Sequence, residues 1–559
     1  MTQAEIPLTT PAAIAEQKPA HPKAWKWYDY FTFNTDHKVI GIQYIVTGFV
    51  FYLIGGLMAE VMRTELATPD PNVVAPNVYN SLMTNHGTIM IFFWVVPAAI
   101  GGFGNYLVPL MIGAKDMAFP RLNAAAFWLN PVAGLLLGAS FLFGGSQSGW
   151  TAYPPLSLIT APTAQSFWCL AIALVGTSSI LGSVNFIVTI LMMRAPDMKW
   201  NQVPLFCWAM MATGILALIS TPALAAGLIL LLFDLNFGTS FFKPDAGGNV
   251  VIYQHLFWFY SHPAVYLMIL PIFGLMSEVV STHARKPIFG YKAIAYSSIA
   301  ICLVGTVVWA HHMFTSGISP WLRVYFTIAT MIVAVPTGVK VLSWIATLWG
   351  GKIRFTSAML FALGFLSMFV FAGITGIMLA SSAFDLHVHD TYFVVGHFHY
   401  TLFGGSVFGI YAGLYHWFPK MTGRMMNEPL GRLHFVLTFI GTHLTFMPMH
   451  ELGLLGMPRR IALYDPQFQT LNQICTYGAY ILGISVLPFL INVIWSWMKG
   501  PAAGDNPWNS LSLEWTTSSP PPIENWDVVP AITHGPYDYG MNGRSAEAAT
   551  SDEATAGVS

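Results

Sequence analysis

The chain has 559 residues, of which 55% are hydrophobic and only 9% charged, and its formal net charge is −1. Soluble domains carry roughly a quarter charged residues, so this composition excludes an ordinary soluble protein and indicates a polytopic membrane protein. No Lys/Arg cluster is large enough to predict a nucleic-acid partner. The four cysteines lie far apart, which argues against a cysteine-based metal centre or a disulfide framework.

Apolar segments of membrane-spanning length recur along the chain. A spanning helix needs about 20 mostly apolar residues, and twelve stretches meet this requirement. We therefore predict an all-α integral membrane protein built as a bundle of twelve transmembrane helices. The stretches are 40–62, 82–112, 121–144, 166–193, 203–233, 253–280, 291–316, 320–348, 355–382, 391–419, 432–455 and 472–498.

Three parts of the chain follow from these stretches. Residues 1–36 form a polar N-terminal tail without the apolar stretch of a secretory signal peptide. Residues 37–500 hold the twelve-helix domain. Residues 501–559 form a polar, Pro-rich tail that ends in low-complexity sequence, and we predict that it is cytoplasmic and partly disordered.

The positions of Lys and Arg predict the orientation. When the stretches alternate in direction, most basic residues fall in the N-terminal tail and in the loops on its side. Because cytoplasmic loops carry the excess of positive charge, both termini are predicted to be cytoplasmic. Lys340 is the exception, since it lies within the segment 320–348. An ionisable residue there is costly and is a candidate for function, the alternative being a lysine that snorkels to the membrane surface.

Six histidines fall at one predicted depth. At a rise of about 1.5 Å per residue, all of them lie in the outer part of the membrane. They are His86, His262, His311, His312, His397 and His399. Scattered core histidines would not share a level, and neutral imidazole is a common ligand of haem iron and copper. We therefore interpret all six as metal ligands.

The spacing of two of these histidines assigns them to different groups. Residues two apart on a helix point roughly 200° apart. His397 and His399 therefore face opposite sides of their segment and could ligate two different haems.

The remaining spacings favour a copper site. His311 and His312 differ by about 100° and can reach one ion, and His262 would complete a three-nitrogen set suited to copper. Tyr266 follows His262 by four residues, on the same face and one turn deeper. A phenol beside such a copper is a plausible hydrogen-atom donor to O2.

These residues stand in motifs that resemble subunit I of cytochrome c oxidases over about residues 27–530. The motifs are His262-Pro263-Ala264-Val265-Tyr266, the pair His311-His312, and His389-Asp390-Thr391-Tyr392-Phe393-Val394-Val395-Gly396-His397-Phe398-His399-Tyr400. The resemblance implies that His86 and His399 are the axial ligands of a low-spin haem and that His397 ligates a high-spin haem where O2 binds. It implies that His262, His311 and His312 hold copper, with Tyr266 covalently joined to His262.

Further cofactor contacts are implied by the same resemblance. His389 and Asp390 match a Mg2+ or Mn2+ site that is completed by an acidic residue of subunit II. Arg459 and Arg460 match the arginines that contact haem propionates, and Trp150 is expected nearby. Arg63 resembles the arginine that hydrogen-bonds a haem formyl group, which indicates haem A.

Two proton routes from the inner side are also implied. Lys340 and Thr337 resemble a route that leads up to Tyr266. Asp116, Asn105 and Asn123 resemble the mouth of a second route, although for Asp116 alone a solvated loop acid would be the favoured interpretation. Many family members carry Glu at the position of Ala264. Here Tyr260 and Ser261 precede it, as in a subgroup where this pair replaces the Glu.

The resemblance therefore implies the catalytic subunit of an oxidase that reduces O2 to water and pumps protons. It also implies a location in the bacterial plasma membrane, with subunit II (carrying a dicopper centre), subunit III and cytochrome c as partners. A quinol oxidase is the nearest alternative, but Ile54 and Met58 stand where quinol members carry an Arg/Asp pair. Nitric oxide reductases lack the Tyr266 equivalent. A proton-relay transporter without cofactors, or a simple electron-carrying cytochrome b, are the alternatives of other classes.

Overall fold

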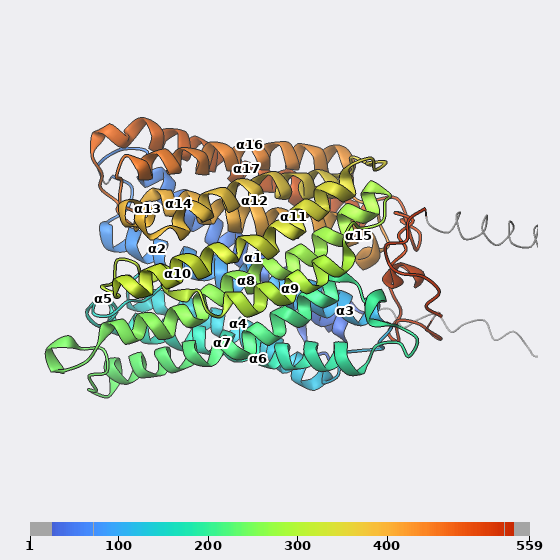
Figure 1. The fold of residues 1–559 in the computed structure, drawn as a ribbon, viewed down its shortest axis with the longest axis horizontal. Helices are drawn as coiled ribbons and strands as arrows, with labels where there is room; N and C mark the ends of the chain where they lie inside the picture. The colour runs from blue at the N-terminus through green and yellow to red at the C-terminus, as the bar shows by residue number, and fades with distance from the viewer. Residues whose placement is uncertain (1–24, 71, 530, 541–559) are drawn as a thin grey trace, which may run out of the picture.

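The computed structural model describes residues 25–70, 72–529 and 531–540, and within these ranges it is helical with no strand. The helices run side by side along the long axis of the molecule (Figure 1). They are α1 (His37–Glu65), α2 (Pro76–Thr88), α3 (Asn105–Ile112), α4 (Pro120–Ala139), α5 (Leu156–Ile159), α6 (Pro162–Met192), α7 (Leu205–Asn236), α8 (Val250–Ala284), α9 (Tyr291–Gly305), α10 (Pro320–Ile332), α11 (Ala334–Leu348), α12 (Ser357–Ala380), α13 (Ser382–Val388), α14 (Tyr392–His399), α15 (Phe408–Thr422), α16 (Glu428–Leu454) and α17 (Gln469–Lys499).

Nine helical segments of the described chain are long and apolar enough to cross a membrane. Three of the twelve expected stretches, 291–316, 391–419 and 432–455, are not among these nine segments. Segment 291–316 divides into α9 and a 3-10 turn at Trp309–Met313, and segment 391–419 divides into α14, a π-helical stretch and α15. Segment 432–455 forms one uninterrupted helix, α16.

Burial separates central helices from peripheral ones. In the 18-residue apolar stretch of α8, 89% of the residues are buried, and in that of Pro76–Ile112 the share is 83%. In the corresponding stretch of α1, only 22% of the residues are buried. Peripheral helices expose large apolar side chains such as Leu57, Leu135 and Trp321. Contiguous exposed apolar surface of this kind is stable only against lipid. The chain is therefore a multi-pass membrane protein.

Local sequence explains where several helices begin and break. Asp36 caps α1, because its side chain accepts hydrogen bonds from the backbone N–H groups of Lys38 and Val39. The break between α10 and α11 at Val333 lies three residues before Pro336, which has no N–H to continue the hydrogen-bond ladder.

Two of the expected apolar segments, 82–112 and 391–419, contain π-helical turns. The stretches Ile89–Val95 and Pro97–Gly104 join α2 to α3, and Tyr400–Val407 joins α14 to α15. Each follows a predicted haem ligand, His86 in the first case and His399 in the second. Wider turns of this type occur mostly at functional sites.

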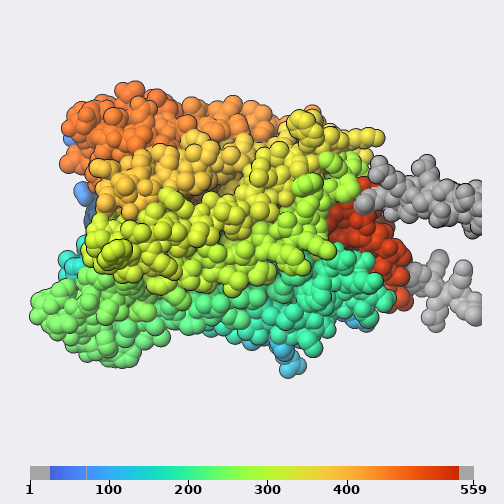
Figure 2. All heavy atoms as spheres, viewed as in Figure 1, coloured from blue at the N-terminus to red at the C-terminus, as the bar shows by residue number. Residues whose placement is uncertain are grey.

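The two ends of the bundle differ. One end holds the start of α1 and the end of α17, and we call it the tail end; the opposite end, where α2, α13 and α14 begin, we call the histidine end (Figure 1). Described residues between 500 and 540 lie across the tail end, where they appear red in Figure 2. Trp508, Trp515 and Tyr537 are buried there. The predicted N-terminal tail lies outside the described residues up to residue 24, and so do residues 541–559.

Candidate functional site

His86 and His399 face each other across a gap of the size of a metal ion. Their rings are nearly parallel, at 19°, with centroids 6.5 Å apart. Metal–imidazole bonds are about 2 Å long, so two rings on opposite sides of one ion have centroids about 6 Å apart. The pair would therefore hold one haem iron.

Hydrogen bonds direct the correct nitrogen of each ring into this gap. His86 Nδ1 lies 2.8 Å from the Gly55 carbonyl oxygen, and His399 Nδ1 lies 2.9 Å from that of Val395. A carbonyl can only accept, so each Nδ1 carries the proton and donates. Each Nε2 therefore holds the lone pair that a metal requires.

His262, His311 and His312 converge on one point. His311 Nε2 and His312 Nε2 are 3.0 Å apart, and His262 Nδ1 is 3.2 Å from His312 Nε2. One nitrogen from each ring lies within 4.8 Å of the others, the one such group of three in the described chain. Three imidazole nitrogens that converge within reach of a single ion form a donor set suited to copper.

The 3-10 turn that carries two of these residues was not expected. His311 and His312 lie on Trp309–Met313 rather than at the top of a continuous α-helix. The Thr330 hydroxyl donates to the Phe326 carbonyl, so His311 Nδ1 donates to Thr330 Oγ1 at 3.1 Å. This bond holds His311 Nε2 toward the other two rings.

Tyr266 lies beside the trio, and its ring centroid is 4.6 Å from that of His262. His262 Nε2 is buried and has no hydrogen-bond partner among the described residues. An unpaired buried polar atom is rare and needs a physical explanation. A covalent link from this nitrogen to the adjacent Tyr266 would provide one.

His397 lies on the other side of α14 from His399, as its spacing predicts. The Thr375 hydroxyl donates to the Ala372 carbonyl, so His397 Nδ1 donates to Thr375 Oγ1 at 2.9 Å. A side chain at Gly376 would contact the His397 ring at 3.0 Å, so this ring packs directly on the α12 backbone. Sequence reasoning missed Thr330 and Thr375, because each contact joins different helices.

The loops at the histidine end bring several predicted residues together. Arg459 forms an ion pair with Asp390, and its backbone N–H donates to the Asp390 carbonyl at 2.9 Å. Burial alone would raise the pKa of Asp390, but the Arg459 guanidinium lowers it below its ordinary value. Burial lowers the pKa of Arg460 to about 10, so this residue remains charged at neutral pH. His389 Nδ1 lies 2.8 Å from the Asp385 carboxylate, a partner that its spacing of four residues could have indicated.

Trp150 and Arg63 flank the predicted haem ligands. Trp150 packs against Gly87, the neighbour of His86, and its ring lies 5.8 Å from that of Trp258. Arg63 is buried and donates through Nη2 to the Asn472 side chain at 2.9 Å. Its Nε has no partner among the described residues, so one donor remains for a group outside the chain.

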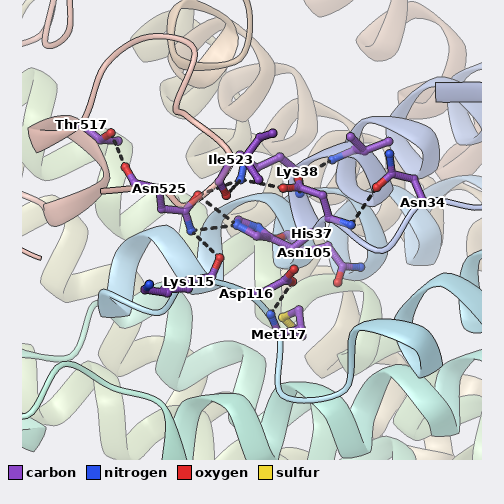
Figure 3. Close-up of polar contacts among 12 residues, drawn as sticks. Asn34, His37, Lys38, Asn105, Lys115, Asp116, Met117, Thr517, Ile523 and Asn525 are labelled. Atoms are coloured by element: carbon purple, nitrogen blue, oxygen red, sulfur yellow. Dashed lines mark hydrogen bonds and ion pairs between the residues drawn. The ribbon is translucent and has the colours of Figure 1, made fainter. Parts of the chain in front are cut away.

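Asp116 lies in a polar cluster at the tail end (Figure 3). The Met117 N–H donates to its carboxylate at 2.6 Å. Asn525, from the C-terminal segment, accepts from Lys38 Nζ at 2.8 Å and contacts His37 Nε2 at 3.0 Å. Burial raises the pKa of Asp116 to about 7. This carboxyl can therefore exchange protons at neutral pH, whereas a solvated loop acid would stay ionised.

Unpaired polar atoms lie on the helices that lead away from this cluster. Asn105 Oδ1, Asn123 Nδ2 and Ser261 Oγ are buried without a hydrogen-bond partner among the described residues. Tyr260 is also buried, with its ring stacked on Phe92. Buried polar atoms of this kind are usually satisfied by internal water.

Lys340 lies apart from these residues, buried between α11 and α9. Its Nζ donates to Ser298 Oγ at 2.7 Å and to the Ile294 carbonyl at 2.9 Å. It therefore does not snorkel to the surface. Thr337, its predicted companion, donates instead to the Val333 carbonyl of its own segment.

Comparisons with known proteins agree with this geometry. Residues 39–481 match the family described as cytochrome c and quinol oxidase polypeptide I. The chain is 75% identical over 544 residues to a Thermostichus vulcanus protein named cytochrome c oxidase subunit 1, covering 97% of this chain and 98% of that protein. A Synechocystis protein of the same name is 65% identical over 522 residues, covering 93% and 94%. A solved haem–copper terminal oxidase dimer shares the fold, with a TM-score of 0.74 at 21% identity over 83% of this chain and 84% of that one. The chain belongs to the family of cytochrome c and quinol oxidase polypeptide I.

Proposed function

We propose that the chain is the catalytic subunit of a terminal respiratory oxidase. It would reduce O2 to water with electrons from cytochrome c and couple this reaction to proton pumping. The observation that carries the proposal is the convergence of three imidazole nitrogens, 3.0 and 3.2 Å apart, beside Tyr266. The relatives named cytochrome c oxidase subunit 1 support the same reading.

The arrangement of histidines supports two haems and one copper ion, and we extend the proposal to a Mg2+ or Mn2+ ion at the interface with subunit II. His86 and His399 would hold the low-spin haem and His397 the high-spin haem, and His262, His311 and His312 would hold copper. When bound, the irons and copper supply the one-electron chemistry that O2 reduction needs. The free Nε of Arg63 favours a formyl-bearing haem A. His389 and Asp390 would need further ligands from subunit II to hold Mg2+ or Mn2+.

The protein residues would deliver the protons. Asp116 would take up protons at the tail end, and water held by Asn105 and Asn123 would carry them toward Tyr260 and Ser261. The buried Asn105 Oδ1, Asn123 Nδ2 and Ser261 Oγ atoms support that route, because without a partner among the described residues they need water.

A second route would supply Tyr266. Lys340 would pass protons from the inner half of the membrane toward Tyr266, and Thr337 would belong to the same route. Its complete burial without a carboxylate partner supports a role other than structural pairing.

The expected topology is twelve transmembrane helices with both termini cytoplasmic, in a bacterial plasma membrane. The start of α1 and the C-terminal segment lie at the same end of the bundle, which supports the placement of both termini on one side. Subunit II with its dicopper centre, and subunit III, would complete the enzyme.

The purified complex tests this function directly. We expect two haem absorption signatures, copper bound to the chain, and O2 consumption with reduced cytochrome c. Tyr266→Phe should abolish O2 reduction while both haem signatures remain, and Tyr296→Phe, at an exposed position, is the matched control. A colourless protein would contradict the proposal in favour of a transporter. O2 consumption with quinol but not with cytochrome c would assign the chain to the quinol branch.

A further inference from the structure

The side chain of Lys340 is docked on α9 by a neighbour that the sequence did not single out. Lys340 and Ser298 are 1% and 2% exposed, and the lysine Nζ lies 2.7 Å from the serine Oγ. No carboxylate of the described chain lies within 4.0 Å of this nitrogen. A buried amine without a charged partner depends on its few neutral acceptors.

Of the two acceptors of the Lys340 amine, only Ser298 Oγ accepts no other hydrogen bond from the described residues. The other one, the Ile294 carbonyl, already accepts from Ser297 Oγ at 2.8 Å and from Ser298 Oγ at 3.2 Å. A carbonyl oxygen has two lone pairs, so the Ile294 oxygen is crowded before Lys340 reaches it. The Ser298 oxygen receives only the lysine among the described residues.

The docking point lies on the face of α9 that leads to Tyr266. A side chain at Gly305 would contact the Tyr266 ring at 2.8 Å, so α9 touches Tyr266 at this residue. Ser298 and Gly305 are seven residues apart, which is about two helical turns on nearly the same face, or about 10 Å. One face of α9 therefore contacts Lys340 through Ser298 and Tyr266 through Gly305.

We propose that Ser298 is a positioning residue that docks Lys340 on α9 and so sets the rate of proton delivery toward Tyr266. This inference rests on the proposed function, because it assumes that Lys340 carries protons. No bond is made or broken by Ser298 itself, which only accepts a hydrogen bond from the amine. Without the hydroxyl, the amine keeps one crowded acceptor and samples other positions.

The experiment compares Ser298→Ala with Ser298→Thr, which keeps the hydroxyl, and with Ser297→Ala, which removes a buried neighbour that makes no hydrogen bond to Lys340. Lys340→Met is the reference for complete loss of the route. Anaerobic mixing with a reductant gives the rate of high-spin haem reduction, and a pH dye gives the accompanying proton uptake. Unchanged spectra of the oxidised complexes establish that each variant is assembled, and Ser298→Cys replaces the Ala variant if that one does not assemble.

We expect Ser298→Ala to slow both rates about tenfold, equivalent to about 1.4 kcal/mol. The Thr variant and Ser297→Ala should stay within about twofold of wild type. In the Lys340→Met background, Ser298→Ala should add no further loss, because the two residues act as one unit.

Two results would overturn the inference while leaving the route intact: wild-type rates in Ser298→Ala when Lys340→Met is slow, or slowing that simply adds to that of Lys340→Met. Wild-type rates in Lys340→Met itself would overturn both the inference and the proposed lysine route.

Discussion

The raised pKa of Asp116 predicts a measurable dependence of stability on pH. The folded value is about 7 and the ordinary value is 3.8, so the folded chain binds more protons between these limits. The contribution to stability is therefore complete below about pH 4 and is lost as the pH rises through about 7. Asp116→Asn has no carboxyl to ionise, so the variant keeps the part of the unfolding free energy that the wild type loses as the pH rises.

The size of the effect follows from this shift. If Asp116 were fully buried, raising the pH from about 5.5 to about 8 would lower the unfolding free energy of the wild type by about 2 kcal/mol. Because Asp116 is only partly buried and lies near Lys38, about 1–2 kcal/mol is the expected loss. Unfolding entropy scales with length at about 2 cal/mol/K per residue, so the Tm difference between Asn variant and wild type should widen by about 1–2 °C.

Thermal unfolding at the two pH values measures this difference, and Asp197→Asn, at an exposed loop position of the same end, is the matched control. Infrared difference spectra of wild type minus Asp116→Asn add a direct test. A carboxyl C=O band should titrate with a midpoint near pH 7. A midpoint near 4, together with a Tm difference that does not change with pH, would refute the reasoning.

Three further predictions concern the proton route, the C-terminal segment and the metal site. Tyr260→Phe should slow O2 consumption and proton release in vesicles by at least about tenfold, with an unchanged Tm because its hydroxyl bonds no described residue; unchanged rates would contradict the route. Asn525→Ala removes an acceptor from buried Lys38 and should speed hydrogen exchange of residues 505–526 by about 10–100-fold; wild-type protection would show that other contacts hold this segment. His311→Ala should lower the copper content of the purified complex by about one ion per complex, as measured by atomic absorption, while the copper of subunit II and the haem absorption remain; copper at the wild-type level would contradict the three-histidine site.

Properties that depend on length and spacing could be predicted from the sequence. Most of the length of each expected apolar stretch is helical in the structure, because the requirement of about 20 apolar residues is a simple count. Likewise, residues two apart on a helix must diverge, so His397 and His399 serve different sides of α14. These inferences do not require knowledge of which helices pack against each other.

Breaks and long-range contacts could not be predicted in this way. The apolar stretch 291–316 predicts one helix, so it gave no sign of the end of α9 at Gly305 or of the 3-10 turn with His311. Asn525 contacts His37 across 488 residues of sequence, and no local pattern marks an asparagine in a Pro-rich segment as a partner. Ser298 escaped notice for the same reason, because its importance depends on which helix packs beside it.

The π-helical stretch Tyr400–Val407 has a consequence for the rotational phase of its segment. A π turn absorbs one residue more than an α turn, so the part before it and the part after it are set at angles that are independent of each other. The outer part can aim His397 and His399 while the inner part, α15, keeps its own packing face. Deleting a single residue here would remove the one that the wider turn takes up, so the stretch would relax to α-helix with the parts on either side near their present angles. The same deletion in an α-helical turn between the ligands and α15 would rotate the two parts by about 100° relative to each other. Both ligands would then face away from their partners, although neither had been altered.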